Sequence, residues 1–196
     1  MHQPSRKIAP PLVLAWVLAL VLTGWIEAHA GDEPWSDLDE GRRDGMDVGR
    51  VDFARLPFDR AIALVYGTGS RTIVSFADPN CGYCKESMRE LDALGDVTVY
   101  LFLYPILGED SREKSERIWC APDRAQAWRA WMLEGRLPAP AACDASAIEE
   151  NLRLGRELRI SWVPTIILPS GKRISGLIRA DDLGDLLTGE ASGLRR

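Results

Sequence analysis

The stretch that decides the fold is residues 78–86, DPNCGYCKE, in which two residues separate Cys81 from Cys84. Three kinds of site have two cysteines at this spacing: a redox pair that opens and closes a disulfide, half of a metal site, and two buried thiols without chemistry. The elements predicted on either side of the pair, and the other cysteines of the chain, distinguish among these three.

The residues around the cysteine pair predict a strand that turns into a helix. Residues 71–76 (RTIVSF) are β-branched and apolar, which is typical of a buried strand. Residues 78–80 (DPN) then break the strand and favour the start of a helix. In the helix predicted from about Cys81 to Leu94, one stripe holds the residues that recur at helical spacing: Cys81, Cys84, Met88 and Leu91.

A cysteine at the start of a helix has unusual chemistry. Unpaired N–H groups and the helix macrodipole favour an anion there, and such positions lower the pKa of a cysteine thiol from its ordinary value of about 8.5. The thiolate is the species that attacks a disulfide. We therefore expect Cys81 to be the attacking thiol and Cys84, one turn deeper on the apolar stripe, to be the resolving thiol. Gly82 and Tyr83 are expected to set the local shape and the reduction potential of the pair.

The remaining segments predict an α/β fold with a mixed sheet. Residues 61–66 (AIALVY) are either the end of a helix or a strand, and periodicity does not distinguish the two. The other predicted elements are strands at 97–103, 165–168 and 172–178, and helices at 113–134 (interrupted near Pro122), 147–158 and 180–187.

The first thirty residues are predicted to be a secretory signal peptide. They contain Arg6 and Lys7, an apolar stretch at 11–26 and the small-x-small sequence AHA at 28–30, which are the three parts of such a signal. An uncleaved N-terminal anchor is the alternative. We divide the rest of the chain into a flexible polar lead-in (31–55), one folded domain (56–190) and a tail (191–196).

The predicted signal contains both histidines of the chain, His2 and His29. Without them, Ser-His and Cys-His catalysis, histidine-ligated zinc and axial haem histidines are excluded. The full chain has a net charge of −5, and removal of Arg6, Lys7 and Glu27 with the signal leaves −6. This acidic balance gives no reason to expect nucleic acid or anionic lipid as a partner.

Two further cysteines, Cys120 and Cys143, bring the number to four in a chain predicted to be exported. Export favours disulfides, so these two are expected to pair as a structural disulfide worth about 3 kcal/mol. One alternative is an all-cysteine zinc site, although the second pair here is C-x22-C, whereas such sites usually present two tight pairs. The other alternative, a set of inert core thiols, is disfavoured by export.

The segment FADPNCGYCK at 76–85 resembles the active-site stretch of the bacterial periplasmic disulfide isomerases of the DsbC/DsbG group. The similarity extends over about residues 56–187 and includes three further motifs. These are VTVYLFLYP at 97–105, IWCA at 118–121 with Cys143 as the second structural cysteine, and Val163-Pro164-Thr165. The resemblance implies a thioredoxin-like fold with a mixed central sheet and a helical insertion.

The resemblance also implies a substrate site and its partners. Pro164 is expected to be cis beside the cysteine pair, and the backbone of Val163 to pair with an extended substrate, with Gly82 and Tyr83 next to it. No small-molecule cofactor and no metal are expected, because the disulfide carries the electrons. The implied partners are disulfide-containing exported proteins and a membrane thiol reductant of the DsbD type, and the implied location is the periplasm.

The sequence departs from the family pattern in three places. Trp162-Val163 precedes the proline, where isomerases of this group usually carry Gly-Thr and strongly oxidising relatives carry valine, so the reduction potential is open. Ser75 stands where thioredoxin has a buried acid, which leaves Asp78 as the candidate proton acceptor for the resolving thiol. The isomerases dimerise through a separate N-terminal domain, for which residues 31–55 are too few, so a monomer is expected.

Together these features indicate an exported thiol–disulfide oxidoreductase, a reductase or isomerase of protein disulfides that acts through a C-G-Y-C dithiol. A redox-inactive thioredoxin-fold binding module or assembly chaperone is the alternative from another functional class. A zinc-binding protein with an all-cysteine site is the third hypothesis.

Overall fold

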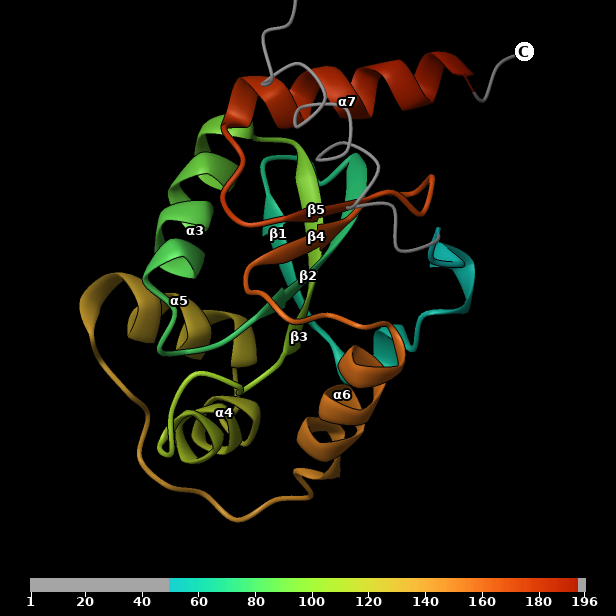
Figure 1. Cartoon of the computed structure of the whole chain (residues 1–196). Coiled ribbons are helices and arrows are strands. Elements are labelled where there is room, and N and C mark those ends of the chain that lie inside the picture. The colour runs from blue at the N-terminus through green and yellow to red at the C-terminus, as the bar shows by residue number, and fades with distance from the viewer. Residues whose placement is uncertain (1–49, 194–196) are drawn as a thin grey trace, which may run out of the picture. The chain divides into compact units, whose positions relative to one another are not determined.

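The computed structural model describes residues 50–193, which build a five-stranded sheet covered by helices (Figure 1). The spatial order of the strands is β1-β3-β2-β4-β5. Their bounds are β1 Ile62–Tyr66, β2 Arg71–Ala77, β3 Val97–Leu103, β4 Thr165–Ile167 and β5 Arg173–Ser175. The predicted signal peptide, most of the predicted lead-in and the last three residues of the tail lie outside the described residues.

The centre of the sheet is the parallel pair of β2 and β3, in which Ile73 lies opposite Val99 and Ser75 opposite Leu101. Both strands are almost entirely buried, as expected of parallel strands covered on both faces. β1 pairs with β3 and β4 pairs with β2, each in antiparallel orientation, and β5 pairs antiparallel with β4. The prediction of a mixed α/β sheet is therefore confirmed.

Residues 61–66, which the sequence left between helix and strand, form β1. Buried and exposed residues alternate along it, with Ile62, Leu64 and Tyr66 facing inward. A period of two belongs to a strand with one face on the core. The short apolar run is thus compatible with either element, and its pairing with β3 decides the outcome.

Five helices surround the sheet: α3 Gly82–Leu94, α4 Ser111–Trp119, α5 Arg124–Glu134, α6 Ser146–Glu157 and α7 Ala180–Gly193. The helical region predicted at 113–134 is two helices separated at Pro122, as expected of a residue that has no backbone N–H. Asp123 caps α5 by accepting a hydrogen bond from the backbone N–H of Gln126 (2.9 Å). α7 is longer than the predicted 180–187.

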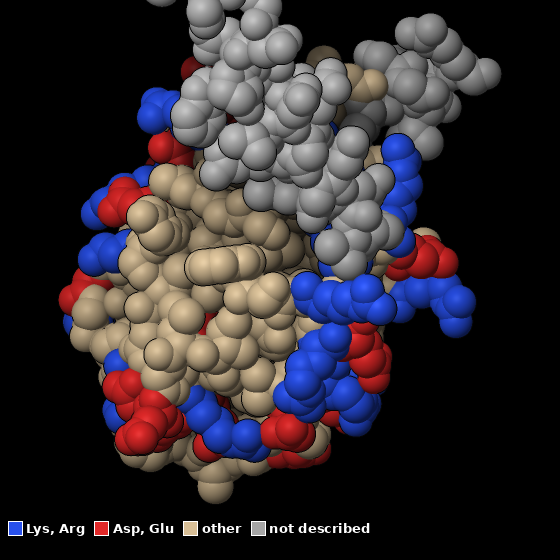
Figure 2. All heavy atoms as spheres, viewed as in Figure 1, with Lys and Arg blue, Asp and Glu red and all other residues tan. Residues whose placement is uncertain are grey.

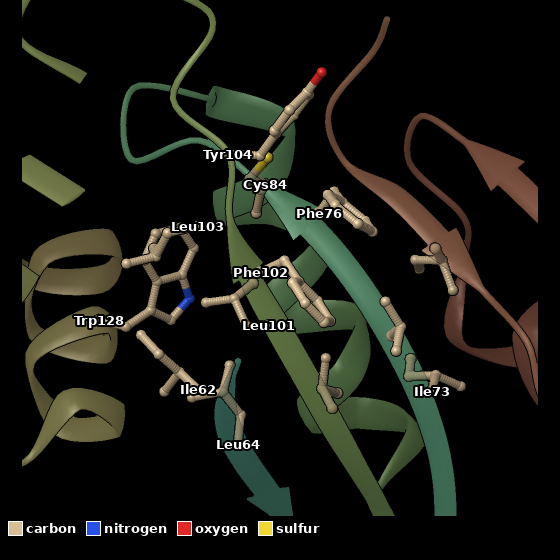
Figure 3. Close-up of a cluster of buried hydrophobic side chains, with 14 of the residues drawn as sticks. Ile62, Leu64, Ile73, Phe76, Cys84, Leu101, Phe102, Leu103, Tyr104 and Trp128 are labelled. Atoms are coloured by element: carbon tan, nitrogen blue, oxygen red, sulfur yellow. The ribbon is translucent and has the colours of Figure 1, made fainter. Parts of the chain in front are cut away.

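The two faces of the sheet pack against different helices, and α3 and α6 lie on opposite sides (Figure 1). On the face toward α3 and α5, Cys84 and Trp128 approach buried strand residues such as Leu101 (Figure 3). On the other face, the Phe76 and Phe102 rings stack with their centroids 4.9 Å apart. Strand β2 runs through this core and delivers the chain to the start of α3, which fixes the position of the cysteine pair.

The folded part of the chain begins earlier than the sequence predicted. Val51 is buried, and its N–H donates a hydrogen bond to the carbonyl oxygen of Gly171 (3.0 Å). The short 3₁₀ helices η1 (Phe53–Arg55) and η2 (Phe58–Arg60) follow, with the Phe53 and Phe58 rings 5.5 Å apart. The prediction of a flexible lead-in up to residue 55 is therefore wrong for its last five residues, because the charged sequence conceals apolar anchors.

Within residues 50–193, no helix has both the length and the apolar character that crossing a membrane requires.

Candidate active site

Cys81 and Cys84 form a disulfide at the start of α3, with their Cα atoms 5.1 Å apart. Cys81 is the N-cap of the helix, in extended backbone conformation, and Cys84 lies within the first turn. The apolar stripe predicted for this helix is confirmed, because Cys84, Met88 and Leu91 are all buried. The strand-to-helix turn predicted from the sequence therefore places both sulfur atoms together.

The backbone around Cys81 is arranged to receive negative charge on sulfur. The N–H of Cys84 donates a hydrogen bond to Sγ of Cys81 (3.0 Å), in the place where an N-cap side chain normally accepts one. A thiolate at Cys81 would keep this bond and face the positive end of the helix macrodipole. The expected difference in exposure is small in the disulfide form, at 4% for Cys81 and 2% for Cys84.

The loop before β4 contacts the cysteine pair, as the resemblance implied. The Val163–Pro164 peptide bond is cis, and the carbonyl oxygen of Val163 lies 3.4 Å from Sγ of Cys81. The side chain of Val163 is buried, so this residue offers its backbone rather than its side chain to a substrate. Thr165 fastens the loop, because its hydroxyl donates a hydrogen bond to the carbonyl oxygen of Trp162 (2.7 Å).

Asp78 is fully buried and holds the loops next to the site. Its carboxylate accepts hydrogen bonds from the backbone N–H of Asn80 (2.7 Å), Ile106 (2.6 Å) and Leu107 (2.8 Å), and from the hydroxyl of Ser111 (2.8 Å). These four donors occupy both carboxylate oxygens. Asp78 therefore anchors loops, and its candidacy as proton acceptor for the resolving thiol is wrong in this geometry.

Side chains from α4 and α5 support the loop that precedes Cys81, and sequence reasoning missed them. The indole N–H of Trp131 donates a hydrogen bond to the carbonyl oxygen of Pro79 (2.7 Å). The ammonium group of Lys114 donates to Asn80 Oδ1 (2.6 Å) and lies over the Trp131 ring, 4.8 Å from its centroid. Hydrogen bonds from Lys114, and then from Asn80, hold the pKa of Asp110 below its ordinary value.

Exposed apolar side chains belong to the three segments that converge on Cys81. Tyr83 follows it directly and is 67% exposed, and Trp162 precedes the Val163 contact and is 71% exposed. Ile106 and Leu107, whose backbone is bound by Asp78, are exposed as well. Figure 2 shows a broad face of mostly uncharged residues with acidic and basic side chains around its edge. Next to the cysteines, the space beyond Gly82 is open, since an added Cβ would meet no atom within 4 Å.

Cys120 and Cys143 form the second disulfide, with their Cα atoms 5.5 Å apart. It joins the C-terminal end of α4 to the segment before α6, where the indole N–H of Trp119 also donates to the carbonyl oxygen of Asp144 (3.1 Å). The predicted pairing is the one observed. An all-cysteine zinc site would need the four sulfur atoms in one place, whereas here they are divided between two disulfides. Within residues 50–193, no group of three or more His, Cys, Asp or Glu side chains is arranged to hold a metal ion.

Comparison with known proteins supports the fold and the site. A family model described as thioredoxin-like domain matches residues 58–189. A crystal structure of a disulfide interchange protein from Neisseria gonorrhoeae superposes with a TM-score of 0.65 at 35% identity, over 68% of this chain and 97% of that one. The predicted thioredoxin-like fold is thereby confirmed.

Curated relatives carry the same resemblance. A protein of Bordetella parapertussis named probable thiol:disulfide interchange protein DsbC is 48% identical over 133 residues, which are 68% of this chain and 47% of that protein. The thiol:disulfide interchange protein DsbC of Escherichia coli K12 is 37% identical over 109 residues, 53% of this chain and 45% of that protein. The chain spans about half the length of the curated relatives it matches.

Proposed function

Because the chain belongs to the thioredoxin-like domain family, we propose that it is a thiol–disulfide oxidoreductase that acts on protein disulfides through Cys81 and Cys84. One observation carries the proposal: Sγ of Cys81 lies between the first N–H groups of α3 and the cis-proline loop. A thiolate gains stabilisation at that position, and the loop offers backbone groups to an extended chain.

The reaction has two steps. The Cys81 thiolate attacks one sulfur of a substrate disulfide, a mixed disulfide forms, and the other substrate sulfur leaves as a thiolate. Cys84 then attacks Sγ of Cys81, which releases the second substrate thiol and closes the Cys81–Cys84 bond seen here. If a substrate thiol performs the second attack instead, the result is isomerisation, and the reverse direction oxidises the substrate.

Backbone pairing at Val163 orients the substrate. Among the described residues, the Val163 N–H has no main-chain hydrogen bond, and its carbonyl oxygen contacts only Sγ of Cys81. An extended peptide that bonds to these two groups would lie across Cys81, with its side chains reaching the exposed rings of Tyr83 and Trp162. The uncharged surface around the site favours segments of unfolded or partly folded proteins over small charged thiols.

The location and the redox partner belong to the same proposal. Two disulfides in one domain fit an oxidising compartment, so we place the protein in the periplasm, exported by its predicted signal. Repeated reduction of substrates needs an electron source, for which a membrane thiol reductant of the DsbD type is the expected partner. The proposal includes a monomer in solution, which light scattering on the purified protein tests.

Redox titration tests the proposal directly. The protein is equilibrated in a series of glutathione buffers, free thiols are alkylated, and the modified cysteines are mapped by mass. We expect Cys81 and Cys84 to interconvert at a potential between about −120 and −270 mV while Cys120 and Cys143 stay bonded. A Cys81→Ser variant should lose insulin-reduction activity. Full activity of that variant would refute the proposal and favour a redox-inactive binding module.

A further inference from the structure

The resolving cysteine lies beside a small enclosed space between α3, α5 and the sheet. The cavity has a volume of about 10 Å³, which is near the smallest space that takes up one water molecule. Its polar lining comes from four residues, Cys84, Ser75, Ser87 and Trp128, all of them buried. Apolar side chains, among them Leu101 of β3, form the rest of the wall.

Trp128 brings an unusual feature to this cavity. Its Nε1 is buried and has no hydrogen-bond partner in the structure, although a buried indole N–H normally finds one. Figure 3 shows the indole ring with its nitrogen turned toward the sheet at Leu101. The packing of the indole is otherwise complete, since almost none of its surface is exposed. An unpaired donor, hydroxyl groups and a thiol sulfur around one water-sized space are the partners that a buried water requires.

We infer that one water molecule occupies this cavity, held by Trp128 Nε1–H and the Ser75 hydroxyl, and that it stabilises the Cys84 thiolate by a hydrogen bond. Trp128 can only donate, so the water oxygen accepts from it and both water protons are free for Ser75 and for Sγ of Cys84. The arrangement takes the place of the acid at position 75. The inference rests on the proposed function, because it concerns the second step of the exchange.

That step needs an unprotonated Cys84. In the mixed disulfide, the Cys84 thiol loses its proton, its sulfur bonds to Sγ of Cys81, and the bond between Cys81 and the substrate sulfur breaks. The substrate sulfur leaves as a thiolate and takes up one proton, so the substrate is reduced and the cysteine pair is oxidised by two electrons. A buried thiolate is costly without a hydrogen-bond donor, and the water supplies that donor. Trp128 and Ser75 are therefore positioning residues that act through the water.

The test is the pH dependence of the resolving step, measured with oxidised glutathione as the probe. Reduced protein is mixed with the probe, samples are quenched in acid, and mass spectrometry follows the Cys81–glutathione adduct as it forms and disappears between pH 5 and 9. For Trp128→Phe and Ser75→Ala, we expect the midpoint of adduct disappearance to rise by about one pH unit, a tenfold slowing below the midpoint. Adduct formation should be unchanged, since neither substitution touches Cys81.

Trp119→Phe is the matched control. Trp119 is also a buried tryptophan, but its N–H is bound to Asp144, so its loss can destabilise the fold without moving the midpoint. An unchanged midpoint in both test variants, or an equal shift in the control, would overturn the inference. If Trp128→Phe does not fold, Ser75→Ala carries the test alone. Failure of the wild-type protein to form any adduct would instead reject the proposed function, so the two failures are distinguishable.

Discussion

Gly155 in the middle of α6 should resist replacement by alanine, although alanine is the better helix former. A Cβ built at Gly155 would lie closer than 3.0 Å to three atoms of the Tyr104 side chain. Tyr104 cannot move aside cheaply, because it is buried, its hydroxyl donates to the carbonyl oxygen of Ile160 (3.0 Å), and its ring packs edge-on against Phe76. The substitution therefore sets overpacking against helix propensity.

The magnitudes decide the sign of the effect. Overpacking a core costs about 1–3 kcal/mol, and displacing the Tyr104 hydroxyl adds about 1 kcal/mol for the lost hydrogen bond. Alanine in place of glycine returns about 1 kcal/mol through helix propensity. We expect Gly155→Ala to lower the free energy of unfolding by about 1–3 kcal/mol. Urea denaturation followed by circular dichroism measures this change.

Two matched variants make the test specific to the Gly155–Tyr104 contact. Gly189 lies in α7 and has open space where its Cβ would be, so Gly189→Ala should raise the free energy of unfolding by up to about 1 kcal/mol. In a Tyr104→Leu background, Gly155→Ala should lose most of its cost. A Gly155→Ala protein as stable as the wild type, or an undiminished cost in the Tyr104→Leu background, would refute the steric reasoning.

Four further predictions concern residues elsewhere in the domain. Asp78→Ala leaves four buried donors unpaired and should lower the free energy of unfolding by about 3 kcal/mol or more in urea denaturation. Replacing Cys120 and Cys143 by serine should cost about 3 kcal/mol, a difference that disappears when the wild type is unfolded in reductant. Hydrogen bonds from a threonine hold the pKa of Asp96 below its ordinary value, so its carboxylate stabilises the fold above about pH 4 and that contribution disappears as the pH falls. Asp96→Asn should flatten this loss in denaturation curves between about pH 2 and 6. Trp162→Ala should slow insulin reduction and leave the reaction with glutathione unchanged, whereas equal slowing of both would argue against a protein-binding surface.

Local chemistry made the strand-to-helix turn at the cysteine pair predictable. Periodicity reports burial, so the stripe that runs from Cys84 to Leu91 faces the core as expected. Proline near residue 122 divides the helical region for a reason that acts within one turn. The contact of Val163 with Cys81 came from the family resemblance, because no local rule joins residues 82 positions apart.

Contacts between distant segments were not predictable. Asp78 looked like a candidate acid because of its place near Cys81, but its donors come mainly from residues 28 to 33 positions later in the chain. The hydrogen bond from Trp131 to Pro79 spans 52 positions, and no pattern in the sequence marks it. Val51 was missed since a single apolar residue among charged ones gives no periodic signal.

The hydrogen bonds that α4 and α5 make to the loop before Cys81 have a consequence for how such a protein can be altered. The carbonyl of Pro79 and the amide of Asn80 are held by Trp131 and Lys114, so the geometry of the catalytic turn is written partly in the helical insertion. Transplanting the C-G-Y-C tetrapeptide into a scaffold without these helices would move the letters and leave their support behind. Conversely, changes confined to the insertion offer a way to retune the reactivity of Cys81 while the tetrapeptide stays the same.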